Sequence, residues 1–128
     1  MKYNDLIPEL MVSDIERSKA FYVSLLRFNM AYERAEDRFV FLSLNDIQLM
    51  LEQGTEEELG KLNYPFGKGV NFSFGMDNVQ EVYERLKAHH YPIRSELEKR
   101  TFRVDDASVT QIEFCICDPD GYVIRITS

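Results

Sequence analysis

The stretch FCICDPDGYVIRITS, residues 114–128, consists of two apolar runs joined by a tight turn. Pro119 presets its own φ angle and Gly121 tolerates a positive φ, so residues 118–121 predict the turn of a β-hairpin. The second run carries one charge, Arg125, between Ile124 and Ile126. This raises the question whether Arg125 is an ordinary surface residue or occupies a position that would otherwise carry a functional side chain.

The chain before this hairpin repeats one order of elements. The second half predicts a strand at residues 69–76, a helix at 77–90 capped by Asp77 or Asn78, and strands at about 97–105, 110–117 and 122–127. The first half predicts a strand at 4–12, a helix at 13–26 capped by Ser13 or Asp14, and strands at about 28–34, 38–44 and 47–53. A shift of 64 positions superposes the start of one half on the other. The sequence therefore predicts a single α+β domain, 1–128, with two βαβββ modules (1–53 and 69–128) joined by a loop (54–68).

Strand alternation separates a helix-facing set of side chains from an opposite set. The set expected to pack on the helices is apolar: Leu49, Leu51, Val70, Phe72, Phe74, Ile112, Phe114, Ile116, Tyr122, Ile124 and Ile126. The opposite set mixes aromatic and methionine side chains with a few polar groups: Ile7, Glu9, Met11, Phe39, Phe41, Gln48, Met50, Glu52, Asn71, Ser73, Glu113, Cys115 and Arg125. Such a mixture is typical of small-molecule sites.

Composition narrows the possible partners. The 128 residues carry a net charge of −7, which argues against nucleic acid, because phosphate binding requires basic patches. No apolar run is long enough to span a membrane and no signal peptide is evident, so we expect a cytoplasmic protein. Cys115 and Cys117 would point to one face of a strand, where they are poorly placed to bridge each other. We expect His89 and His90 to lie at a helix end in a solvated role rather than a catalytic one.

Four patterns in order carry a family resemblance: ELMVSDIERSKAFYVSLLRF, FVFLSLNDIQLMLE, PFGKGVNF and DPDGYVIRI. Together with the doubled βαβββ order, they resemble the vicinal-oxygen-chelate superfamily, which includes glyoxalase I, extradiol dioxygenases and bleomycin-resistance proteins. The resemblance implies mixed sheets that curl around a cleft. Its enzymes hold a divalent metal, and the matching positions here are Ile7, Met50, Asn71 and Arg125. None of these is a good metal ligand, so the resemblance is closest to the metal-free bleomycin-resistance type, with no cofactor.

These observations lead to one leading hypothesis and two alternatives. The leading one is a protein that sequesters a small, cationic or amphipathic molecule in a cleft at a homodimer interface, with the loop around Tyr64 and Phe66 reaching over the cleft. The candidate ligand-binding residues are Glu9, Phe39, Phe41, Met50, Glu52, Phe66, Asn71, Ser73, Glu113 and Arg125. Arg125 could instead form a structural ion pair with a neighbouring glutamate, and the three glutamates could be solvated. The alternatives are a lyase, isomerase or dioxygenase with a divergent metal site, and a structural module whose cleft has no ligand.

Overall fold

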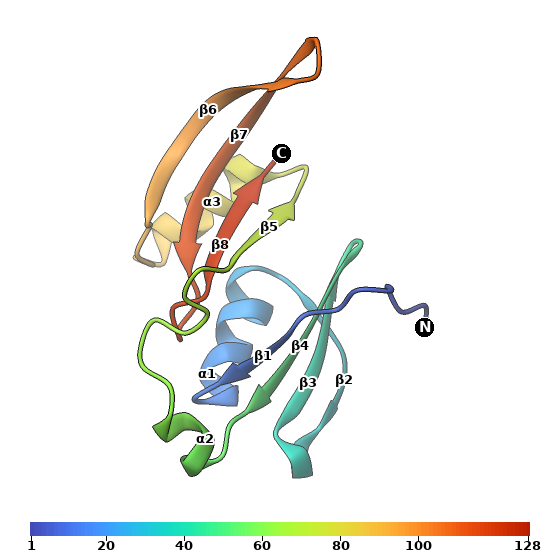
Figure 1. The fold of residues 1–128 in the computed structure, drawn as a ribbon, viewed down its shortest axis with the longest axis vertical. Coiled ribbons are helices and arrows are strands. Elements are labelled where there is room, and N and C mark those ends of the chain that lie inside the picture. Colours follow the sequence, from blue (N-terminus) through green and yellow to red (C-terminus); the bar gives the residue numbers. More distant parts are fainter. The chain divides into compact units, whose positions relative to one another are not determined.

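The structure is a computed structural model that describes residues 1–128 as two compact units, Met1–Phe66 and Gly67–Ser128 (Figure 1). Each unit contains one four-stranded mixed sheet with a helix following its first strand. The predicted α+β fold with two βαβββ modules is therefore confirmed. The expected curl of the sheets around a cleft is not borne out: both sheets are uncurled, and each is open, with an edge strand on either side.

The first unit has the strand order β1-β4-β3-β2. Only β1 and β4 run parallel; the other neighbours are antiparallel. Its elements are β1 (Glu9–Val12), α1 (Ile15–Lys19), the π-helical turn η1 (Ala20–Leu25), β2 (Asn29–Arg34), the short η2 (Ala35–Asp37), β3 (Phe39–Leu44), β4 (Ile47–Gln53) and α2 (Glu56–Gly60).

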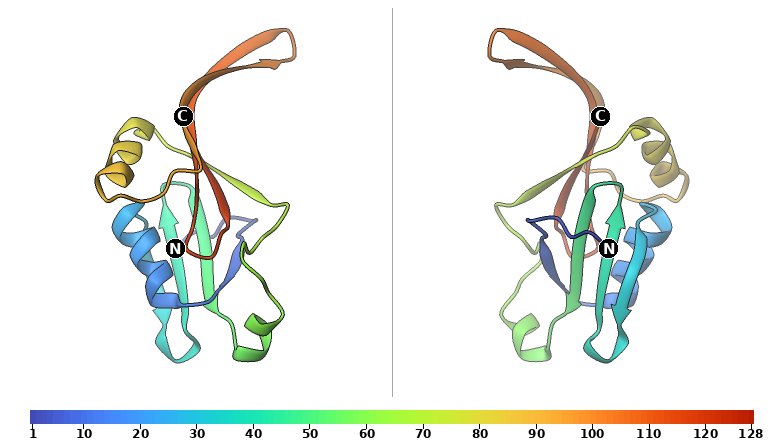
Figure 2. Two further views of the ribbon diagram at one scale, coloured as in Figure 1. Left: turned by 90° about the vertical axis from the view of Figure 1, so that its left-hand side faces the viewer. Right: turned by 90° about the vertical axis from the view of Figure 1, so that its right-hand side faces the viewer.

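The second unit repeats this topology with the order β5-β8-β7-β6, in which β5 and β8 are parallel. Its elements are β5 (Asn71–Gly75), α3 (Val79–Ala88), β6 (Ser95–Val104), β7 (Ala107–Cys117) and β8 (Val123–Thr127). Figure 2 shows that β6 and β7 form a long hairpin. None of the helices in either unit is both long and apolar enough to cross a lipid bilayer.

Each unit buries its own core between sheet and helix. In the first unit the buried side chains include Val12, Tyr22, Leu26, Val40, Leu42, Leu49 and Leu51, and in the second they include Val82, Leu86, Phe114, Ile116, Ile124 and Ile126. Three residues expected in this core are not fully buried: Val70 is 48 % exposed, Ile112 is 38 % exposed and Phe72 is half-buried. Val70 precedes β5, and Ile112 lies on a part of β7 that β8 does not reach.

The strand expected at 69–76 and the helix expected at 77–90 are each shorter, at Asn71–Gly75 and Val79–Ala88, and other boundaries differ as well. The first strand begins at Glu9 rather than at residue 4, and the first helix continues as the π-helical η1. The segment expected as a loop, 54–68, contains α2. The strand expected from about residue 110 begins at Ala107. Of the capping alternatives, Asp14 caps α1, since its side chain accepts from the backbone N–H groups of Glu16 and Arg17 at 3.0 and 3.2 Å.

Candidate functional site

The face of the first sheet that lies opposite α1 carries two cross-strand rows of side chains. Gln53 accepts a hydrogen bond from the backbone N–H of Ile15 at 3.0 Å, which identifies the helix-facing side of β4. Met50 and Glu52 alternate with Gln53 and lie on the other side. The strand register then gives one row Glu9, Met50, Phe41, Tyr32 and a second row Met11, Glu52, Phe39, Arg34.

Glu9 and Glu52 form a carboxyl pair at the β1 end of these rows. The hydrogen bond between Glu52 and Glu9 raises the pKa of Glu52 above its usual value of 4.5, and desolvation and the charges of Glu9, Asp37 and Glu58 act in the same direction. Two carboxyl groups in this contact hold a proton more tightly than either would alone, because two negative charges at short distance repel. The pair is therefore a place where a cation would replace a proton.

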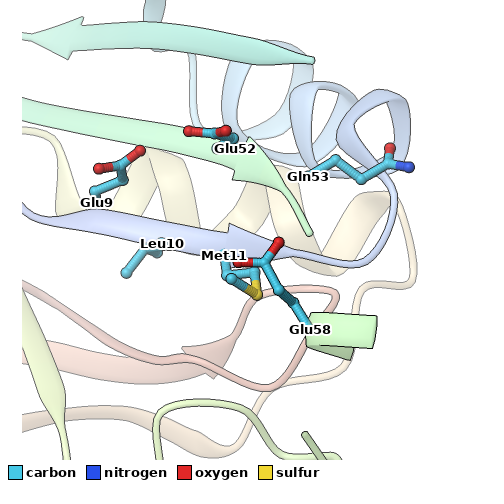
Figure 3. A pocket seen from close by; sticks show the side chains of 6 residues that line it. All are labelled: Glu9, Leu10, Met11, Glu52, Gln53 and Glu58. Carbon is cyan, nitrogen blue, oxygen red and sulfur yellow. The ribbon is translucent and has the colours of Figure 1, made fainter. Parts of the chain in front are cut away.

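A cavity of about 330 Å³ opens beside this pair. Its lining is Glu9, Leu10, Met11, Glu52, Gln53 and Glu58 (Figure 3). Figure 3 shows the carboxyl groups of Glu9 and Glu52 near each other above β1 and β4, with Glu58 reaching in beside Met11. Three carboxyl groups and the apolar side of Met11 thus share one pocket.

The short helix α2 fixes the position of Glu58. Thr55 and Glu58 form a capping box, in which Glu58 Oε1 accepts from the Thr55 N–H at 3.0 Å and Thr55 Oγ1 accepts from the Glu58 N–H at 3.1 Å. The backbone N–H of Thr55 lowers the pKa of Glu58, with the Thr55 side chain adding to the effect. Glu58 therefore ionises at a lower pH than Glu52 does.

Gly54 allows α2 to approach β1 closely. A Cβ atom at Gly54 would lie 2.8 Å from Met11 Sδ and 3.0 Å from Leu59 Cδ2, closer than real Cβ contacts. The absent side chain leaves space that Met11 and Leu59 both approach, so α2 can lie close to β1.

The other end of both rows is an aromatic ladder, which we define as Tyr3, Phe41, Tyr32, Phe39 and Arg34. Tyr32 stacks on Phe41 with ring centroids 5.1 Å apart, and Tyr3 meets Phe41 edge-on at 5.5 Å. The Arg34 guanidinium lies 4.0 Å from the centre of the Phe39 ring. These contacts contribute to covering Phe39 and Phe41, which are only 4 % and 1 % exposed.

Gln48 holds the segment that carries Tyr3. Its side-chain amide donates to the Lys2 carbonyl at 2.8 Å and accepts from the Asn4 N–H at 2.7 Å. Tyr3 is itself 53 % exposed, and its hydrogen bond with Tyr32 raises the pKa of the Tyr3 phenol. The accessible aromatic surface of this face therefore includes Tyr3, above the buried phenylalanines.

In the second unit, Arg125 belongs to an ion-pair network. Arg125 Nε lies 3.5 Å from Glu113 Oε2, and its NH1 donates to Ser73 Oγ at 3.1 Å. Arg100 NH1 donates to the other oxygen of Glu113 at 3.2 Å. The Glu113 side chain is only 5 % exposed, whereas Arg125 and Arg100 are 35 % and 48 % exposed. The expected structural ion pair of Arg125 with a glutamate is confirmed, and Glu113 is neutralised by two arginines.

Comparison with known families identifies the fold. The family model of the Glyoxalase/Bleomycin resistance protein/Dioxygenase superfamily matches residues 6–126. The chain belongs to this superfamily. No curated protein matches the chain.

Several solved structures resemble the chain over almost its whole length. A member from Vibrio splendidus 12B01 is 32 % identical, with 93 % of this chain and 92 % of that one covered, at a TM-score of 0.44. A virulence protein from Salmonella typhimurium is 22 % identical over 99 % and 98 %, with a TM-score of 0.71. A lactoylglutathione lyase from Agrobacterium tumefaciens is 20 % identical over 99 % and 95 %, with a TM-score of 0.63. The last two show a shared fold.

The metal implied for enzymes of the superfamily does not fit the residues of this chain. Ile7 and Met50 offer no oxygen or nitrogen donor from their side chains, and Asn71 is a neutral amide. Arg125 places a guanidinium at the fourth position, where it forms an ion pair with Glu113 and a hydrogen bond with Ser73. No group of three or more His, Cys, Asp or Glu side chains is arranged to hold an ion anywhere in the chain.

The ten predicted site residues fall into two groups, one in each unit. In the first unit Glu9 and Glu52 meet in the pocket, Met50 lies between Glu9 and Phe41, and Phe66 is a half-buried residue outside the sheet. In the second unit Ser73, Glu113 and Arg125 are joined, and Asn71 is exposed on the edge strand β5. Their contact with a ligand stays a prediction.

Sequence reasoning missed four residues of these clusters: Tyr3, Tyr32, Glu58 and Arg100. The position of Glu58 at the start of a helix could have been predicted, because Thr55 and Glu58 have the spacing of a capping box. Tyr32 and Arg100 lie on predicted strands, but their neighbours depend on cross-strand register, which the sequence does not state. Nothing in the sequence indicates the position of Tyr3, because the hydrogen bonds that hold its segment are made by Gln48, 45 residues further along the chain.

Proposed function

We propose that the protein binds a cationic small organic molecule in the pocket of its first unit and sequesters it unchanged, as a metal-free member of the bleomycin-resistance type. The observation that carries the proposal is the Glu9–Glu52 carboxyl pair in a 330 Å³ pocket that Glu58 also lines. An ammonium or guanidinium group placed between the two carboxylates would satisfy both and remove their repulsion.

The surroundings favour an organic cation over a bare ion. Met11 lines the pocket, and the row from Glu9 continues through Met50 to Phe41 and Tyr32. Thioether and aromatic side chains provide dispersion and cation–π attraction to an apolar or aromatic body. The pocket volume is at the lower end of the range for small-molecule sites, which suits the charged end of a larger ligand.

The experiment is titration calorimetry of the purified protein with bleomycin, after a thermal-shift screen of cationic and neutral aromatic compounds. Glu9→Gln and Glu52→Gln keep the shape of the side chain and remove one charge. Each should weaken a cationic ligand by roughly tenfold, because a charge-assisted hydrogen bond contributes about 1.5–3 kcal/mol. Glu36→Gln is the matched control, since Glu36 is exposed on η2 and does not line the pocket.

A neutral aromatic compound that binds as well as the cations would contradict the proposal, as would Glu9→Gln and Glu52→Gln variants with the affinity of the parent. If no compound in the screen stabilises the parent, the pocket has no cationic ligand of this class. If only anions bind, Arg125 would instead be the anchor of the binding site.

A further inference from the structure

The two cysteines of the chain lie side by side on an inner strand of the second sheet. Cys115 and Cys117 belong to β7, which lies between β6 and β8 (Figure 1). Their register with β8 is unbroken, with Cys115 opposite Arg125 and Cys117 opposite Val123. Two strand residues separated by a single residue point to the same side of a sheet, so both thiols share one face.

That face is the one opposite α3, and it is open to small solutes. The residues that alternate with the cysteines are buried, since Phe114 is 1 % and Ile116 is 0 % exposed. The Phe114 ring meets Tyr83 of α3 edge-on, with centroids 5.2 Å apart, which identifies the helix side. Cys115 and Cys117 are both half-buried and neither is in a disulfide. An ion can therefore reach both sulfur atoms, while the neighbouring strands partly shield them from water.

The spacing of the two thiols suits a bridging ion better than a disulfide bond. Two residues along a strand span about 6.6 Å, and the Cβ atoms on one face are separated by a similar distance. A disulfide requires Cβ atoms only about 3.5–4.5 Å apart. An ion with two metal–sulfur bonds of about 2.3 Å holds the sulfur atoms up to about 4.6 Å apart. The two side chains need only lean toward each other to reach that separation.

The small number of ligands determines which ions fit. Zinc takes four ligands in structural sites, and no third His, Cys, Asp or Glu side chain is arranged with the pair to hold an ion. The cross-strand neighbours Arg125 and Val123 offer no donor for a metal. Thiolates favour soft ions such as Cu(I), which is stable with two sulfur ligands in a line. A site of two thiols alone therefore favours Cu(I) over zinc.

The surroundings of the thiols also argue against a nucleophilic role. Desolvation raises the pKa of the Cys117 thiol, and the charges of Asp118 and Cys115 act in the same direction. The nearby positive charge of Arg94 opposes this effect. A thiol that keeps its proton is a weak nucleophile, whereas a soft ion displaces the proton. Two thiols and one Cu(I) give a bis-thiolate complex of net charge about −1 and about two released protons, and Arg94 lies where it attracts that negative charge.

We propose that Cys115 and Cys117 bind one Cu(I) ion between their two thiolates, on the open face of the second sheet. The site uses none of the four positions that match the superfamily metal ligands. It also shares no residue with the pocket of the first unit. The inference is therefore independent of the organic cation proposed for that pocket.

Anaerobic titration of the reduced full chain with Cu(I), in competition with the chromogenic chelator bicinchoninate, measures affinity and stoichiometry. We expect one Cu(I) per chain. Cys115→Ser and Cys117→Ser should each weaken binding at least about a hundredfold, because loss of an outer-shell partner alone costs about 10–100-fold and here a ligand is lost. The control is His89→Asn/His90→Asn, which removes both imidazoles of the chain and should bind Cu(I) as the parent does. Circular dichroism checks that each variant keeps the fold.

Two further measurements examine how the ion is held. X-ray absorption at the copper edge should show two sulfur neighbours and no nitrogen. Zinc added in equal amount should not displace Cu(I), because it lacks two of its four ligands here. A parent that binds Cu(I) no better than Cys115→Ser/Cys117→Ser would overturn the proposal. So would nitrogen neighbours at the copper edge, displacement by zinc, or one ion shared by two chains.

Discussion

Glu52 and Glu58 line one pocket, yet their pKa values move in opposite directions. The hydrogen bond between Glu52 and Glu9 raises the pKa of Glu52, so the folded protein binds a proton at Glu52 more tightly than the unfolded chain does. The capping box lowers the pKa of Glu58, so folding favours its charged form. The pocket therefore holds one carboxyl group that keeps its proton to a higher pH than usual and one that loses its proton at a lower pH than usual.

This difference predicts opposite effects of pH on stability. For Glu52, the free energy of unfolding should fall as pH rises from the usual 4.5 through the raised pKa, because the folded state loses a proton it had retained. For Glu58, stability should be lost as pH falls through the lowered pKa. Urea unfolding of the parent, Glu52→Gln and Glu58→Gln across this pH range measures both. Identical pH profiles for the parent and Glu52→Gln would show that the carboxyl pair does not form.

The affinity for a cationic ligand should change with pH as Glu52 titrates. A cation placed between the two carboxyl groups competes with the proton on Glu52, so affinity for a cationic ligand should rise as pH rises through the raised pKa of Glu52. Binding in that pH range should also release protons. Calorimetry in two buffers with different ionisation enthalpies measures the release, and a zero value there would contradict proton competition.

Glu113 has a structural role that its position on the strand did not reveal. It lies between Arg100 and Arg125 and is almost inaccessible to solvent. It is therefore unsuited to attract a cationic ligand, unlike Glu9 and Glu52. Glu113→Gln should destabilise the fold by about 1–3 kcal/mol, because two arginines lose the acceptor that they share. Glu98→Gln is the control, since Glu98 is exposed and 3.8 Å from Arg100, and it should cost less than about 1 kcal/mol. Equal denaturant midpoints for these two variants would contradict this role.

At the scale of elements, α2 determines the shape of the pocket through its close contact with β1. Gly54→Ala should force Met11 or Leu59 to move, since the new Cβ would lie within 2.8 and 3.0 Å of their atoms. We expect a stability loss of about 1–3 kcal/mol and weaker binding of any pocket ligand. Gly60→Ala provides the matched control at the other end of α2, where a Cβ would meet no atom within 4 Å. That change should be neutral or stabilise by about 0.5–1 kcal/mol, and thermal unfolding compares the two.

The elements themselves were largely predictable, because alternation and helical periodicity are local signals. The strands near 28–34, 38–44 and 47–53 agree with β2, β3 and β4 within a residue. The extent of β7 was not predictable in the same way. Its first residues, Ala107 to Thr110, alternate weakly and follow a turn at Asp105 with a positive φ, so their pairing with β6 is visible only in the structure.

At the scale of the whole molecule, the sequence repeat was sufficient to predict the fold but not to predict which site residues contact one another. Residues that share a row, such as Glu9, Met50 and Phe41, come from three strands, and their contact depends on register. Prediction from alternation placed them on one face but could not distinguish Phe41, which is buried, from Tyr32, which covers it. It also treated Glu113 like Glu9, because the two arginines beside Glu113 come from β6 and β8.

The substitutions at the four superfamily metal positions predict the metal content of the protein. Zinc, manganese, nickel or iron should not remain at stoichiometric levels after desalting, because Ile7, Met50, Asn71 and Arg125 do not form a donor set. Elemental analysis of the purified protein measures this, together with assays for glyoxalase and thiol-transferase activity. A stoichiometric metal whose removal by a chelator abolishes such an activity would favour the enzyme alternative.

The tyrosines of the aromatic ladder provide intrinsic fluorescence that can report on ligand binding. The chain has seven tyrosines and no tryptophan, so its ultraviolet emission comes from tyrosine alone. Tyr3 and Tyr32 both contact Phe41, in the row that begins at the carboxyl of Glu9. A ligand whose aromatic body extends along that row would quench or shift this emission without any attached dye. Tyr3→Phe would then remove part of the signal while leaving the edge-on ring contact in place.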